Sequence, residues 1–120
     1  MSTDISDLMT RNLHHVFSER SPDARAAAMA QLYLDDATFN EAEGVTEGPA
    51  AIGERVGKLL ADAPGLEFVP AGPVVVVQDR GYLPWQLQPE GGGPVILTGT
   101  DVATVVDGRI SSLYTFLTSQ

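Results

Sequence analysis

The sequence has no cysteine, and only two histidines and seven basic residues occur among its 120 residues. The absence of cysteine excludes disulfides, thiolate metal sites and cysteine nucleophiles, and it suits a reducing compartment. No histidine and carboxylate cluster has metal-ligand spacing on one element, so we predict no metal site. No glycine-rich loop follows a strand and opens a helix, so the sequence does not support a phosphate cradle.

Long apolar runs are also absent. No run approaches the ~18 residues that a membrane span requires, and the start, Met1–Asp4, lacks the basic and apolar parts of a signal peptide. Sixteen acidic residues give a formal net charge of −9, which repels phosphate backbones and anionic membranes. We therefore expect a cytoplasmic protein that binds neither nucleic acid nor membrane.

The apolar residues that are present follow a helical pattern in the first half. The apolar content of 43% is normal for a globular protein, and the length predicts a single domain over residues 1–120. Helical spacing predicts helices over residues 5–17 and 23–34, and a third that starts at Pro49 and ends at Ala63-Pro64-Gly65. Proline at the first helical position is a typical start signal for the last two.

Strands are predicted mainly in the second half, where the apolar pattern changes to a two-residue period. Asp107-Gly108 is a strong two-residue hairpin signal. Helices on one side of a curled antiparallel sheet form an α+β domain with a concave cavity. The expected strands span residues 35–41, 44–48 (as a strand or turn), 66–77 with an interruption at 70–73, 82–88, 95–106 and 109–118.

Asp101 is the charged residue on an otherwise apolar face of its predicted strand. Leu97, Gly99, Ala103 and Val105 share that face because successive side chains alternate. A carboxylate buried among apolar groups must be paired, hydrogen-bonded or protonated. Two interpretations follow: a pocket acid with a raised pKa, or a structural carboxylate bonded to backbone or to an arginine.

Glu41, Glu43 and His15 are further candidates for chemistry. The two glutamates share a face with Phe39, and neighbouring carboxylates are candidate general bases because each raises the pKa of the other. The alternative is a solvated strand end. His15 flanks the apolar stripe of the first helix, from which it could reach a pocket or lie half-buried at the surface.

Three stretches carry a family resemblance: Leu32–Glu41 with the following 44–52, Thr98–Ala103, and Asp107–Leu117. They resemble the NTF2-like superfamily, within it the ketosteroid isomerase and SnoaL-like (polyketide cyclase-like) branch. The resemblance implies a cone-shaped roll, in which three N-terminal helices pack on a curved antiparallel sheet that encloses a pocket. It also implies a homodimer. The outer face of the strand from Val95 and the face of the last strand would form the contact.

The resemblance also implies roles for two acids. Glu41 stands where the isomerase has its aspartate general base. Asp101 stands where the isomerase has a protonated aspartate that donates a hydrogen bond. The isomerase's tyrosine on the first helix has no tyrosine counterpart, and His15 is the candidate oxyanion donor. As binding residues we predict Asn12, Phe39, Trp85 and Phe116.

The sequence also departs from one relative within the superfamily. The epoxide-hydrolase branch needs an arginine two residues before an aspartate on one strand, and Gly99 occupies that position. The remaining prediction is an acid–base enzyme without a cofactor that acts through an enolate on a mostly apolar carbonyl compound. Isomerisation and aldol-type ring closure both fit. The alternatives are a non-catalytic domain that binds a hydrophobic small molecule or a protein partner, and a fold that mainly serves dimerisation.

Overall fold

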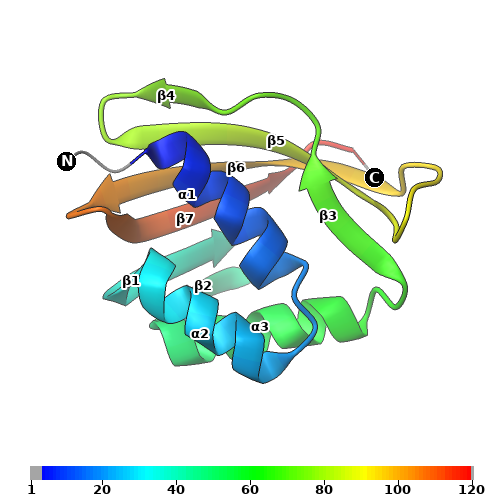
Figure 1. The fold of residues 1–120 in the computed structure, drawn as a ribbon, viewed down its shortest axis with the longest axis horizontal. Coiled ribbons are helices and arrows are strands. Elements are labelled where there is room, and N and C mark those ends of the chain that lie inside the picture. The colour runs from blue at the N-terminus through cyan, green and yellow to red at the C-terminus, as the bar shows by residue number, and fades with distance from the viewer. Residues whose placement is uncertain (1–3, 120) are drawn as a thin grey trace.

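The structure is a computed structural model that describes residues 4–119. Within these residues three α-helices pack on the concave side of a curved, open sheet of seven strands (Figure 1). The helices are α1 (Ile5–Asn12), which continues into the π-helical turn η1 (Leu13–Phe17), α2 (Pro22–Leu32) and α3 (Pro49–Ala61). The strands are β1 (Tyr33–Glu41), β2 (Gly44–Glu47), β3 (Leu66–Pro70), β4 (Val75–Val77), β5 (Arg80–Pro89), β6 (Leu97–Val106) and β7 (Arg109–Leu117).

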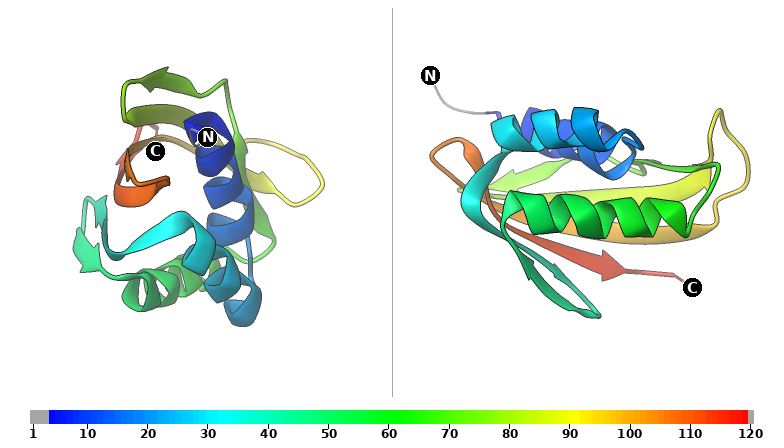
Figure 2. Two further views of the ribbon diagram at one scale, coloured as in Figure 1. Left: turned by 60° about the vertical axis from the view of Figure 1, so that its left-hand side comes forward. Right: turned by 90° about the horizontal axis from the view of Figure 1, so that it is seen from below.

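The strand order is β2-β1-β7-β6-β5-β3, with β4 paired to β5. Every pair is antiparallel except β1 with β7, which is parallel. Figure 2 shows the sheet curling around the helices, with α1 packed on β5 and α3 on β1. The α+β fold predicted from the sequence is confirmed, with the parallel β1–β7 pair as its one departure from an antiparallel sheet in the part of the chain described.

Local sequence explains where the elements begin. The side chain of Ser21 accepts a hydrogen bond from the backbone N–H of Ala24, and Pro22 follows as the first residue of α2. At the β6–β7 hairpin Asp107 and Gly108 have φ values of 52° and 78°. Both residues have the left-handed backbone conformation that a type I′ turn requires, so the predicted hairpin is confirmed.

Several predicted boundaries were wrong by a few residues, and at two of them pairing with the sheet explains the shift. The second helix ends at Leu32 rather than at residue 34, because Tyr33 is buried and pairs with Ile110 of β7. Strand β6 begins at Leu97 rather than at Val95, which is exposed. Tertiary pairing therefore overrides local propensity at these ends.

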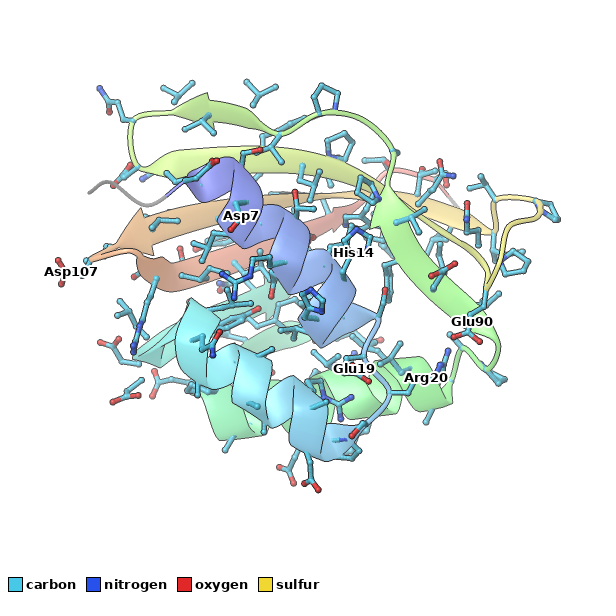
Figure 3. The ribbon with its side chains drawn as sticks, in the orientation of Figure 1. Asp7, His14, Glu19, Arg20, Glu90 and Asp107 are labelled. Carbon is cyan, nitrogen blue, oxygen red and sulfur yellow. The ribbon has the colours of Figure 1, made fainter. Side chains whose placement is uncertain are left out.

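Close contacts hold the helices against the sheet. A Cβ at Gly81 of β5 would collide with Met9 and Ile5 of α1, so glycine lets this helix approach the strand closely. Arg20 donates hydrogen bonds to the carbonyl oxygens of Leu60 and Leu66, at 2.9 and 2.7 Å. Figure 3 shows Arg20 between Glu19 and Glu90, where it ties the end of α3 to the start of β3. Within residues 4–119 no helix has the length and apolar character needed to cross a membrane.

Candidate functional site

A cavity of about 250 Å³ lies under the helices on the concave side of the sheet. Its wall is mostly apolar. Four of the side chains that line it are aromatic: Phe17, Phe39, Phe68 and Trp85. The charged or polar residues among the lining are Glu41, Glu43, Arg55, Asp101 and Thr115. Because few polar groups face this space, each of them has a strong influence on what can bind.

The four aromatic side chains form a connected group. The ring centroids of Phe17 and Phe39 are 5.4 Å apart, those of Phe17 and Phe68 are 6.2 Å apart, and those of Phe68 and Trp85 are 5.0 Å apart. All three pairs meet edge to face, the arrangement that aromatic quadrupoles favour. The rings come from η1, β1, β3 and β5, so the aromatic wall depends on the whole fold.

Asp101 lies in the middle of β6 and is only 3% exposed. The indole Nε1–H of Trp85 donates to its Oδ1 at 2.9 Å, and the hydroxyl of Thr115 donates to the same oxygen at 2.8 Å. Thr115 is the direct cross-strand partner of Asp101 on β7. Among the described residues no hydrogen bond ends on Oδ2. This second oxygen can therefore carry the proton of the carboxyl group or, when ionised, accept a hydrogen bond from a ligand.

Burial raises the pKa of Asp101 to about 6, and the hydrogen bonds from Thr115 and Trp85 oppose that rise. The predicted direction and its main cause, desolvation on an apolar face, are both confirmed. The predicted contribution from Glu41 is not among the causes. Glu41 is instead paired with a cation.

That cation is Arg55 of α3. Its Nε and Nη2 donate to the two carboxylate oxygens of Glu41 at 2.6 and 2.9 Å, and Nη2 also donates to Glu43 at 3.2 Å. The hydrogen bond to Glu41 is the main cause that raises the pKa of Arg55, so the guanidinium stays charged. Such a forked pair fixes a carboxylate in one orientation. Arg55 therefore bridges the two glutamates.

The glutamates also mark the entrance. The side chain of Glu43 is 79% exposed, while that of Glu41 is 15% exposed. A wider groove between the ends of β1 and β7 shares Glu41, Glu43 and Thr115 with the cavity. The cavity therefore reaches the surface at the hairpin that joins β1 to β2, and a ligand that enters there passes the Glu41–Arg55 pair.

Two of the four predicted binding residues, Phe39 and Trp85, line the cavity. Asn12 is buried, but its Oδ1 accepts a hydrogen bond of 2.6 Å from the hydroxyl of Tyr33, which places it in the core behind the wall. Phe116 is 53% exposed and lies on the outer face of the sheet. Thr115 and Leu117 are the residues of β7 that line the cavity, whereas Phe116 lines only the wider groove at its entrance, so a role of Phe116 in binding stays a prediction.

His15 also lies outside the cavity. Its side chain is exposed, and of the described residues of η1 it is Leu13 and Phe17 that line the cavity. The structure therefore gives His15 no access to a ligand there, and its suggested role as oxyanion donor is corrected. Tyr33 is a buried tyrosine that bonds Asn12 behind the cavity wall. Burial raises the pKa of Tyr33, with a smaller contribution from the charge of Asp101, so its hydroxyl stays neutral.

The comparisons with known proteins identify the family of this chain. A model of the SnoaL-like domain matches residues 11–113. The chain belongs to the SnoaL-like domain family. A comparison with curated proteins finds no match to this SnoaL-like chain. In the part of the chain described, residues 4–119, no three His, Cys, Asp or Glu side chains gather to hold a metal ion.

Solved structures share the fold of this SnoaL-like domain. A protein of Agrobacterium tumefaciens, provisionally named an isomerase of the SnoaL-like family, has a TM-score of 0.83 at 22% identity, over 95% of this chain and 98% of its own. A provisionally named polyketide cyclase of Sinorhizobium meliloti has a TM-score of 0.68 at 21% identity, over 91% of this chain and 93% of its own. An NTF2-like protein of unknown function from Cytophaga hutchinsonii has a TM-score of 0.70 at 17% identity, over 98% of this chain and 92% of its own. The fold is thus NTF2-like.

Proposed function

We propose that this SnoaL-like domain is an acid–base enzyme that acts through an enolate on a small, mostly apolar carbonyl compound. The observation that carries the proposal is Asp101. It is a buried carboxyl group in the wall of an apolar cavity, with one oxygen fixed by two donors and the other without a hydrogen-bond partner among residues 4–119. A protonated carboxyl group in such a place is a strong hydrogen-bond donor to a carbonyl oxygen that gains charge.

In this scheme Glu41 is the base. It removes a proton from the carbon next to the carbonyl group, and the electron pair moves toward the carbonyl oxygen, where Asp101 donates a hydrogen bond. Return of the proton to a different carbon completes an isomerisation, while attack of the enolate carbon on a second carbonyl group closes a ring. Neither route changes the oxidation state of the substrate overall, so neither consumes an oxidant or a cofactor.

Arg55 sets the conditions under which Glu41 can act. The forked ion pair takes one bond at each carboxylate oxygen, and a carboxylate has about four lone-pair sites in total. One site on each oxygen therefore stays available for a proton. The pair also holds the carboxylate at the cavity entrance, and such positioning is itself a large part of catalysis.

A second candidate function is favoured by the same ion pair. Both carboxylate oxygens of Glu41 are already engaged by Arg55, and the rest of the cavity wall is mostly apolar. A non-catalytic domain that binds a hydrophobic small molecule uses the same cavity and needs no base. The SnoaL-like fold hosts both kinds of function.

The test is isomerisation of a β,γ-unsaturated cyclohexenone, followed by the ultraviolet absorbance of the conjugated product. We expect turnover that falls by about 10²-fold in Glu41→Gln, the usual contribution of a general base. Glu43→Gln is the matched control, because Glu43 bonds the same arginine but is largely exposed. Binding of such ketones without turnover by the unaltered protein would favour the binding domain instead.

We also propose a homodimer through the outer face of the sheet. Tyr82, Val102 and Tyr114 lie in one row across β5, β6 and β7, and Phe116 is exposed beside this row. A contiguous apolar surface of this kind is typical of a contact between proteins. The cytoplasmic location and the absence of nucleic-acid binding stay predictions from composition.

A further inference from the structure

We propose that the cavity also binds small apolar amines, whose ammonium group pairs with the carboxylate of Asp101 among the aromatic side chains. This inference does not depend on the proposed enolate chemistry, because it uses the ionised form of Asp101 and requires no turnover. The proposed ligands have an apolar body and one positive charge.

The first argument is the charge balance of the cavity. In its ionised form Asp101 is a buried anion, and a buried charge is costly unless it is paired. Arg55 is the one basic side chain that lines the cavity among residues 4–119. It is committed to Glu41 and Glu43 at the entrance. The protein thus supplies no cation to Asp101 from this wall, and a ligand with an ammonium group brings the missing partner.

The second argument is the direction in which Asp101 can accept a bond. The donors from Trp85 and Thr115 both end on Oδ1. Within the described residues Oδ2 receives no protein donor, and Asp101 lines the cavity. An ammonium N–H placed there forms a charge-assisted hydrogen bond, which is shorter and roughly twice as strong as a neutral one.

The third argument is the aromatic wall of the cavity. Phe17, Phe39, Phe68 and Trp85 surround the cavity as a connected aromatic group. Aromatic faces attract cations, and the effect is largest where water is excluded. The same rings accommodate an apolar body. The volume of about 250 Å³ lies just below the usual range for ligand pockets, so the amine must be small.

The other charged groups near the cavity favour a cation as well. Glu41 and Glu43 outnumber Arg55 at the entrance, and the whole chain carries a net charge of −9. Tyr33 of β1, behind the wall, stays neutral. The remaining neighbours of Asp101, Trp85 and Thr115, do not ionise in the neutral range. A pH effect on amine binding near pH 6 therefore reports the protonation of Asp101 itself.

The experiment compares benzylamine with benzyl alcohol, which has a similar shape and no charge. Binding is followed by the indole N–H signal of Trp85, the only tryptophan in the sequence, at about physiological salt so that surface attraction is screened. At about pH 8 we expect benzylamine to bind at least about tenfold more tightly than benzyl alcohol. The preference should disappear at about pH 4.5, where Asp101 is protonated and the amine is still charged.

Two variants complete the test. Asp101→Asn should remove the preference for benzylamine, while Glu43→Gln should keep it, because the charge of this largely exposed side chain is screened by salt. Equal affinity for the two probes in the unaltered protein at pH 8, or a preference that persists in Asp101→Asn, would overturn the proposal. The pH comparison needs no variant, so a failure of Asp101→Asn to fold does not prevent the test. Loss of isomerase activity alone would leave these results unchanged.

Discussion

Replacement of Asp101 by asparagine is expected to make the folded protein more stable at neutral pH than the unaltered protein. The asparagine keeps the shape of the side chain, and its carbonyl oxygen can still accept the bonds from Trp85 and Thr115. What disappears is the cost of ionising a buried carboxyl group. Because the pKa rises from 3.8 to about 6 on folding, that cost is about 3 kcal/mol when Asp101 is fully ionised.

The sign of the pH dependence follows from the raised pKa. The folded state holds the proton of Asp101 more tightly than the unfolded state, so its contribution to stability is fully present below pH 3.8. This contribution is lost as the pH rises through about 6. The free energy of unfolding of Asp101→Asn relative to the unaltered protein should therefore increase by about 2 kcal/mol between about pH 4.5 and about pH 8, and then level off.

Urea unfolding of both proteins across this pH range measures the difference directly. Other carboxylates change the stability of both proteins in the same way, so they cancel in the comparison. A difference that is constant with pH would refute the reasoning, because it would mean that Asp101 has the same pKa in the folded and unfolded states. A slope of the opposite sign would show that hydrogen bonding outweighs burial.

Three further predictions concern other parts of the molecule. Gly99→Ala places a methyl group against the ring of Trp85, so we expect a loss of about 1–3 kcal/mol and a red-shifted tryptophan emission; an unchanged emission spectrum would contradict this. Arg55→Met should change the free energy of unfolding by less than about 1 kcal/mol, because the ion pair is partly exposed, yet reduce isomerase turnover; undiminished turnover would show that the arginine does not position the base. Tyr114→Glu should convert a homodimer to a monomer in light scattering, and a monomeric unaltered protein at micromolar concentration would exclude the dimer.

The sequence correctly predicted on which face of the sheet Asp101 lies, but it could not predict which residue of β7 pairs with Asp101. Alternation along β6 correctly placed Asp101 inward, because its period does not depend on any other strand. A hairpin that closes regularly at Asp107-Gly108 would pair Asp101 with Tyr114. A β-bulge between Thr104 and Val105 shifts the register by one residue, so that Thr115 is the partner.

The same bulge explains why Phe116 is exposed and does not line the cavity. A shift of one residue exchanges the two faces of a strand, and Phe116 pairs with Thr100 on the outer side. Nothing in the sequence of β7 marks the bulge. Arg55 was missed for a different reason: its role arises from the packing of α3 against β1, a contact between segments whose relative placement the sequence does not show. The close contact of Gly99 with the ring of Trp85 was not predicted either, because it arises from the pairing of β5 with β6.

The central claim is that Asp101 is a buried carboxyl group of the cavity whose pKa is raised, and a carbon-13 NMR titration of its carboxyl carbon tests this most directly. The signal is assigned by its absence in Asp101→Asn. We predict a midpoint at about 6, well above the ~3.9 of a free aspartate, because burial penalises the charged form. A midpoint near the value of a free aspartate would contradict the account, since Asp101 would then be neither a donor to a carbonyl oxygen nor an unusual anion near neutral pH.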